Sequence, residues 1–241
     1  MAWVTVDRPE ARNALTAAMY FGIRYAVDRV NGDDSLDGLV ITGSGDVFIP
    51  GGNLGGATPD TWMDFGLLRM DVTPFDAIMQ SPKPVVSAVN GICQGGGLMI
   101  ALLSDVVVAG TNATFRAPEL LRGIADMNFA SILPTQIGPG RARDLLLTGR
   151  TIDATEAERW GLVTRVVDPD ELLPAAERAM EECRQMAPQA RAAVKRGINA
   201  CYPRYDRMSM DLSLAGPEVA EGFRAFKARE RPAWARHTDD E

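Results

Sequence analysis

Short runs of apolar residues alternate with segments of helical periodicity over most of the chain. Residues 3–6 alternate as a strand does, and residues 14–30 place apolar side chains at helical spacing, with Thr16 as the N-cap candidate. Residues 151–157 begin another helix, for which Asp153 is the expected N-cap. Further strands are expected at 38–42, 47–49, 85–89, 105–109, 114–116 and 163–167, and further helices at 62–80, 97–103, 170–187, 188–201 and 217–230.

This order of elements is typical of an α/β fold. Strands alternate with helices through short turns that contain Gly or Pro, which favours mostly parallel strands. From about residue 129 the chain becomes mainly helical, and the tail after about residue 188 contains helices only. We therefore expect an α/β core over 1–187 and a C-terminal helical region over 188–241, and we expect that region to serve oligomerisation.

Composition and charge narrow the possible functions. Hydrophobic residues make up 46% of the 241 residues and charged residues 24%, which excludes a disordered or collagen-like chain. The net charge is −7 and no basic run is present, which argues against nucleic-acid binding as a main function. The longest apolar run, 97–103, is too short to cross a bilayer, and the chain starts with a strand-like segment rather than a signal peptide. We expect a cytoplasmic protein without a membrane partner.

Cysteine and histidine usage argues against several kinds of site. Cys93, Cys183 and Cys201 are widely spaced and form no CxxC pair, which indicates a reducing compartment and no disulfide framework or zinc site. His237 is the only histidine, and it lies close to the C-terminus. A Ser-His-Asp triad or a histidine-rich metal site would depend on that one tail residue. We therefore expect neither, and no metal.

Two glycine-rich loops are the main candidates for chemistry. One is 48–54 (FIPGGNL), just after a predicted strand, and the other is 90–99 (NGICQGGGLM), between a strand and an apolar helix. Glycines at such junctions let the backbone approach a ligand and present N–H groups at a helix N-terminus. Neither loop matches the GxxxxGK[ST] or GxGxxG patterns of nucleotide sites. Each loop taken alone is also compatible with a simple turn.

The second loop lies within a longer segment that resembles a known family. Residues 83–110 (KPVVSAVNGICQGGGLMIALLSDVVVAG) are similar to the signature of the enoyl-CoA hydratase/isomerase (crotonase) superfamily. The resemblance continues, in order, through 7–15, 38–54, 113–125, 145–167 and 221–234, and so covers almost the whole chain. It implies a ββα spiral core, an acyl-CoA thioester substrate with CoA carried as part of that substrate rather than as a cofactor, and a homotrimer or hexamer.

The resemblance also implies a set of site residues. The backbone N–H groups of Gly52 and Gly96 match the oxyanion hole that holds the thioester oxygen, and loss of one such donor costs about 3–4 kcal/mol of transition-state stabilisation. Other positions match regions that contact the adenine and pantetheine of CoA. They are Arg12, Asn13, Ala14, Pro50, Gly51, Asn53 and Leu54, together with Phe226 and Arg229 near the C-terminus.

The chain departs from the hydratase pattern at one position. Hydratases of this family use two glutamates, and the first of them falls on Met99, which cannot transfer a proton. The second matches Glu119, which we interpret as the general acid/base. Without the family match, Glu119 reads equally well as a surface carboxylate that follows a proline.

Asp126 is a second acidic candidate. Counted backward from Gly138, it falls on the acidic position used by dienoyl-CoA isomerases and chlorobenzoyl-CoA dehalogenases. Counted forward from Gly123, it falls one residue short of that position. It therefore either faces the acyl pocket or caps the helix that follows, and the sequence leaves both readings open.

The sequence leaves several functions open, among them hydration of an enoyl-CoA with Glu119 as the single acid/base. One acid/base with an oxyanion hole suffices for a shift of the double bond from 3-enoyl-CoA to 2-enoyl-CoA, and monofunctional isomerases of the family also carry an apolar residue at the position of Met99. Residues 123–131 resemble a turn of hydroxycinnamoyl-CoA hydratase-lyases, in which Tyr202 or Tyr205 would contact a phenol; both tyrosines also fit a packing role. A further possibility is an acyl-CoA binder without activity.

Overall fold

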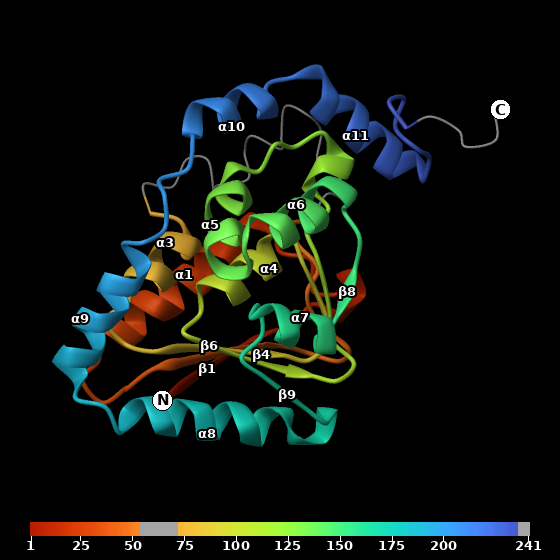
Figure 1. Cartoon of the computed structure of the whole chain (residues 1–241). Helices are drawn as coiled ribbons and strands as arrows, with labels where there is room; N and C mark the ends of the chain where they lie inside the picture. Colours follow the sequence, from red (N-terminus) through yellow and green to blue (C-terminus); the bar gives the residue numbers. More distant parts are fainter. Residues whose placement is uncertain (54–71, 236–241) are drawn as a thin grey trace.

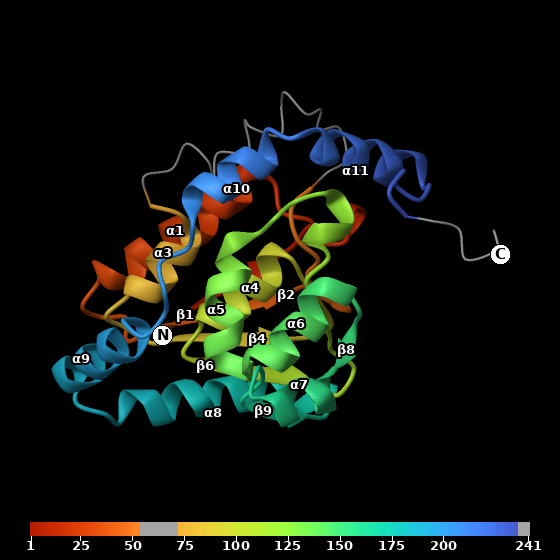
Figure 2. The same ribbon diagram turned by 45° about the horizontal axis from the view of Figure 1, so that its top comes forward.

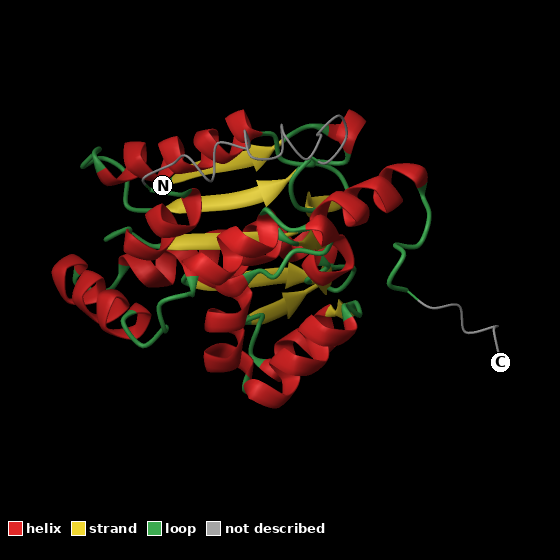
Figure 3. Cartoon of the chain, turned by 90° about the horizontal axis from the view of Figure 1, so that it is seen from above, coloured by secondary structure: helices red, strands yellow, loops and turns green. Residues whose placement is uncertain are grey.

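The computed structural model describes residues 1–53 and 72–235, and in these ranges a parallel sheet of five strands forms the centre of the protein. Every pairing in this sheet is parallel, as expected from strands that alternate with helices. Figure 3 shows these strands side by side. In spatial order they are β1 (Ala2–Val6), β2 (Leu39–Gly43), β4 (Val85–Val89), β6 (Val106–Gly110) and β9 (Arg165–Val167).

A second, smaller sheet carries both glycine loops. Its strands, in spatial order, are β3 (Val47–Ile49), β5 (Ile92–Gln94), β7 (Thr114–Arg116) and β8 (Ile152–Asp153). Ile49 of β3 pairs in parallel with Cys93 of β5, so the residues that follow each strand leave the sheet at the same end. The second glycine loop is therefore not a simple turn throughout, because its residues 92–94 form the strand β5.

The two faces of the main sheet are covered by different helices. In β4, Val86 and Ala88 pack against α8 (Leu172–Arg184), whereas Val85 and Val89 belong to the larger core on the opposite face. That core lies under helices on the other side of the sheet from α8, as Figure 1 shows. These helices are α1 (Ala17–Asn31), α3 (Pro74–Gln80), α4 (Gly96–Leu103), α5 (Met127–Ile137) and α6 (Pro139–Thr148), with α7 (Ala154–Trp160) beside β8.

The helix starts follow local signals in the sequence. The side chain of Thr16 accepts a hydrogen bond from the N–H of Met19, and that of Asp153 accepts one from Glu156, so both expected N-caps are confirmed. Of the helix expected over 62–80, the described part is α3, which begins with a capping box formed by Thr73 and Asp76. The rest of that prediction, and the loop expected at 55–62, lie outside the described residues.

Three helices follow residue 188. They are α9 (Pro188–Asn199), α10 (Arg207–Leu214) and α11 (Pro217–Ala228), and α10 was not expected from the apolar pattern. The last two lie on the side of the molecule opposite α8 (Figure 1 and Figure 2). They share a small apolar cluster with Ile124. Their expected role in oligomerisation stays a prediction. No helix in the described ranges is long and apolar enough to cross a membrane.

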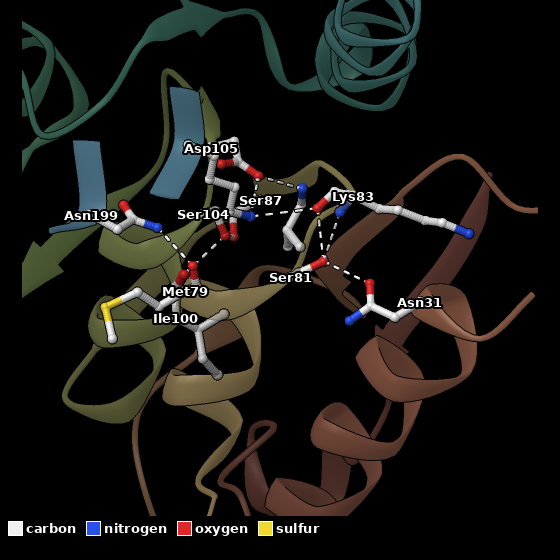
Figure 4. Close-up of polar contacts among 11 residues, drawn as sticks. Asn31, Met79, Ser81, Lys83, Ser87, Ile100, Ser104, Asp105 and Asn199 are labelled. Carbon is white, nitrogen blue, oxygen red and sulfur yellow. Dashed lines mark hydrogen bonds and ion pairs between the residues drawn. The ribbon is translucent and has the colours of Figure 1, made fainter. Parts of the chain in front are cut away.

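Helix α9 is fixed to the core by polar contacts. The Lys195 ammonium lies 2.7 Å from the Asp105 carboxylate, which also accepts a hydrogen bond from the N–H of Val85. The Asn199 side chain donates to the carbonyl of Met79 at 2.7 Å, a contact drawn in Figure 4. Because the Lys195 side chain is only 8% exposed, its charge depends on Asp105 for compensation.

Replacement of Lys195 by Met keeps the apolar stem and removes the charge. We expect Lys195→Met to lower the free energy of unfolding by about 3 kcal/mol, because Asp105 is left without its counter-ion. Arg29→Met is the matched control: its exposed guanidinium lies 3.9 Å from Asp33, and its loss should cost less than about 1 kcal/mol. Urea denaturation measures both, and equal small losses would contradict the structural role given to Lys195.

Candidate active site

The two glycine loops face each other across a narrow gap. Gly51 has φ +106°, a conformation that favours glycine, and a Cβ atom on it would lie 3.9 Å from the backbone nitrogen of Gly96. The first loop is held in place by Leu15, whose N–H donates to Gly51 at 2.9 Å and whose carbonyl accepts from Asn53 at 2.8 Å. The backbones of the two loops therefore approach without intervening side chains.

Two backbone donors at this gap have no acceptor among the described residues. Gly96 is the first residue of α4, where an N–H group has no acceptor within the helix. The N–H groups of Gly52 and Gly96 donate to no other residue in the part of the chain that the structure describes. The N-terminus of α4 adds a favourable field for negative charge. This arrangement suits an oxygen atom that gains charge during a reaction.

A cavity of about 730 Å³ opens at these loops. Its volume is within the range of pockets that hold small molecules. Gly51, Gly52 and Gly96 line it, and its apolar wall includes Met99 and Ile132. The carboxyl-bearing side chains of Glu119 and Asp126 line the same cavity. The cavity thus joins free donors, apolar surface and two acidic groups.

Glu119 begins the 3₁₀ turn η3 (Glu119–Arg122), which follows β7. Its Oε1 lies only 2.9 Å from the place that a Cβ on Gly95 would occupy, so glycine at 95 makes room for the carboxyl. Its Oε2 is buried and has no hydrogen-bond partner in the described ranges. Burial, followed by the nearby charge of Asp126, raises the pKa of Glu119 to about 8.

Asp126 combines the two roles that the sequence left open. Its Oδ1 accepts hydrogen bonds from the N–H groups of Asn128 at 2.9 Å and Phe129 at 3.3 Å, so it caps α5. It also lines the cavity with Glu119. Burial raises the pKa of Asp126 and outweighs the opposing effect of these hydrogen bonds.

Asn13 holds its own segment against the turn between β2 and β3. Its side chain donates to the carbonyls of Ser44 at 3.0 Å and Val47 at 2.7 Å, and its Oδ1 accepts from the N–H of Arg8. Asn13 is buried, so its side chain is occupied by the chain itself. Any contact with CoA at this segment would therefore come from its exposed neighbour Arg12 or from the backbone near Ala14.

The other predicted CoA residues divide into two groups. Pro50, Gly51 and Phe226 line the cavity. Asn53 and Arg229 do not line it, and Arg229 forms the exposed C-terminal cap of α11. Leu54 lies outside the described residues.

Tyr20 of α1 is a site residue that the sequence reading missed. It is 3% exposed, lines the cavity, and has its hydroxyl so close to Gly96 that a Cβ there would collide with it. Burial and the charges of Glu119 and Asp126 raise its pKa, so the hydroxyl keeps its proton. The sequence did contain an indication of this role. Tyr20 carries a hydroxyl on the same buried face of the helix as Ile23 and Val27, where the other buried residues are apolar.

The two tyrosines considered for phenol recognition both line the cavity. Tyr202 accepts a hydrogen bond from the Gln136 side chain at 2.8 Å, which fits a packing role. Arg116 and Arg122 also line the cavity and were not expected there.

The chain is similar to known proteins over nearly its whole length. The sequence model of the enoyl-CoA hydratase/isomerase family matches residues 1–236. The crotonyl-CoA hydratase of Syntrophomonas wolfei is 36% identical, over 94% of this chain and 91% of that protein. The carnitinyl-CoA dehydratase of Salmonella typhi is 34% identical, over 96% of this chain and 93% of that protein.

A solved structure shows the same fold. The enoyl-CoA hydratase/isomerase from Pseudoalteromonas atlantica is 30% identical, covers 97% of this chain and 95% of its own, and superposes with a TM-score of 0.79. Matches of this length and identity are not confined to one motif. The chain therefore belongs to the enoyl-CoA hydratase/isomerase (crotonase) family and is an enzyme of that family.

Proposed function

We propose that the enzyme stabilises the enolate of an acyl-CoA thioester, with the thioester oxygen between the N–H groups of Gly52 and Gly96 and with Glu119 as the single acid/base. The preferred reaction is the shift of a double bond from 3-enoyl-CoA to 2-enoyl-CoA. The observation that carries this proposal is the convergence of two free backbone donors and one buried carboxyl on a single cavity.

The chemistry requires one proton to move between two carbons. The Glu119 carboxylate removes a proton from C2, and the electron pair spreads over the thioester oxygen and the adjacent double bond. The two N–H donors stabilise the charge on that oxygen, and each is worth about 10²–10³ in kcat. Glu119 then returns the proton at C4, which leaves the double bond between C2 and C3.

The apolar surroundings suit Glu119 to this role. Since its pKa is raised to about 8, both the protonated and the ionised form are populated near neutral pH. A carboxylate with a raised pKa is also a stronger base towards a weakly acidic carbon. Asp126 contributes through its charge, which helps to hold the pKa of Glu119 high.

Met99 favours isomerisation over hydration. It lies one turn after Gly96 on α4, is only 2% exposed, and lines the cavity. A thioether cannot activate water, so the two-carboxylate mechanism would need another group in its place. Hydration of an enoyl-CoA with Glu119 as the only acid/base is the second candidate reaction. It is favoured by the names of similar proteins, among them a probable enoyl-CoA hydratase of Mycobacterium tuberculosis that is 32% identical.

The CoA part of the substrate would lie along the first glycine loop. Pro50 and Gly51 border the cavity and Phe226 closes it from α11, which supports contact with pantetheine at these residues. Arg12, Ala14, Asn53, Leu54 and Arg229 are proposed contacts on the strength of the family resemblance. Asn13 could contribute only through its backbone, because its side chain is bound within the chain. Assembly into a homotrimer or hexamer is likewise proposed.

A panel of three thioesters separates the candidate reactions: a 3-enoyl-CoA, crotonyl-CoA and a hydroxycinnamoyl-CoA, each with the product identified by mass spectrometry and NMR. We expect the highest kcat/KM for the 3-enoyl substrate and a loss of about 100-fold or more in Glu119→Gln. Glu177→Gln, on the exposed face of α8, is the control and should match wild type.

Binding of all three thioesters without turnover would identify an inactive acyl-CoA binder. Full activity of Glu119→Gln would transfer the acid/base role to Asp126.

The raised pKa of Glu119 also predicts a pH-dependent stability difference. The folded state holds the Glu119 proton more tightly than the unfolded state, so this residue favours folding fully below pH 4.5 and loses that contribution as the pH rises through about 8. Glu119→Gln should therefore gain Tm relative to wild type over this range, and Glu177→Gln should follow wild type. Differential scanning fluorimetry from pH 4.5 to pH 9 measures the difference. A constant difference across this range would show that Glu119 ionises normally.

A further inference from the structure

Two arginines lie beside the acid/base and have no carboxylate partner among the described residues. Arg116, at the end of β7, and Arg122, at the end of η3, both line the cavity. Neither forms an ion pair with another residue of 1–53 or 72–235. The Nε of Arg116 donates to the carbonyl of Gly149 at 2.6 Å.

Arg122 is held in position and has an unused donor. Its guanidinium lies over the ring of Phe226, 4.3 Å from the centroid, and one terminal nitrogen makes a 3.3 Å contact with the carbonyl of Leu121. Its Nε is buried and has no hydrogen-bond partner in the described ranges. Because this Nε is enclosed by protein, an acceptor in the cavity would bind at the terminal nitrogens of the guanidinium.

The acidic groups of the cavity do not neutralise these arginines. Asp126 caps α5, Asp76 is bound to Thr73 in the capping box of α3, and Asp211 lies 3.6 Å from Arg207. Glu119 is largely protonated at neutral pH because burial raises its pKa to about 8. Burial and the charge of Arg116 lower the pKa of Arg122, and the opposing charge of Glu119 offsets them only in part.

The position of Arg122 indicates where an anion would bind. Glu119 and Arg122 are three residues apart in a 3₁₀ turn, in which such side chains lie on the same face, one turn of about 6 Å apart. Glu119 must reach C2 or C4 of the acyl chain in the proposed reaction. The phosphates of CoA stand at the other end of the pantetheine arm, beyond the thioester. An anion near both Glu119 and Arg122 therefore belongs to the acyl chain.

We propose that Arg116 and Arg122 bind a carboxylate on the acyl group, so that the substrate class is the CoA thioester of an unsaturated dicarboxylic acid. The planar guanidinium of Arg122 matches the two oxygens of a carboxylate, whereas a purely apolar acyl chain would offer the two cations in the cavity no counter-charge. This inference rests on the proposed function in one respect: it takes an acyl-CoA as the ligand of this cavity.

The test measures binding of saturated thioesters, which need no turnover. Isothermal titration calorimetry compares glutaryl-CoA with pentanoyl-CoA, which has the same chain length without the terminal carboxylate, and with CoA alone. Wild type should bind glutaryl-CoA about 10- to 100-fold more tightly than pentanoyl-CoA. Arg122→Met and Arg116→Met should each reduce that preference by about tenfold or more and leave pentanoyl-CoA binding unchanged. Arg122→Lys should retain part of it.

Arg143→Met, on the exposed face of α6, is the matched control and should behave as wild type. Equal affinity of wild type for the two thioesters would overturn the inference, whether or not the variants fold. An equal loss of glutaryl-CoA, pentanoyl-CoA and CoA binding in Arg122→Met would also overturn it, because the arginine would then contact CoA itself. If wild type binds pentanoyl-CoA and glutaryl-CoA equally well, only the inference about the acyl carboxylate fails and the proposed function stands. If neither thioester binds, the proposed function and this inference both fail.

Discussion

The parallel pairing of β3 with β5 is the constraint on which the site depends. Ile49 and Cys93 lie opposite each other, so the segments after both strands leave the sheet together, and Gly52 and Gly96 line one cavity. A single glycine loop supplies one such donor. The second donor requires this pairing, which joins segments more than forty residues apart. The small sheet thus determines the position of the chemistry, and the larger parallel sheet supports it.

Close contacts around these loops explain why side chains are absent there. A side chain at 95 would meet the Glu119 carboxyl, and one at 96 would meet the Tyr20 hydroxyl. Within the described ranges, Oε2 of Glu119 is buried without a hydrogen-bond partner, and burial raises the pKa of this residue. Tyr20, Asp126 and Arg122 line the same cavity. Two of the buried side-chain atoms without a partner in these ranges, Glu119 Oε2 and Arg122 Nε, thus belong to residues of the cavity.

Local patterns in the sequence predicted the elements better than the site. The apolar strands 47–49, 85–89 and 114–116 and the caps Thr16 and Asp153 were recognisable, because each depends on residues close in sequence. Strand β5 was missed because three residues inside a glycine-rich segment pair only with distant strands. Tyr20, Arg116 and Arg122 were missed for a related reason. Their place in the site depends on how α1, β7 and η3 meet, which periodicity does not encode.

If Glu119 and the two glycine loops generate a thioester enolate, the enzyme should exchange the C2 protons of a bound thioester with solvent. A saturated thioester such as butyryl-CoA, incubated with the enzyme in D₂O, should incorporate deuterium at C2 whichever reaction the natural substrate undergoes. We expect exchange with wild type, detected by ¹H NMR, and its loss in Glu119→Gln. Exchange that persists in Glu119→Gln, or a wild type that binds the thioester without exchange, would refute enolate formation by this site.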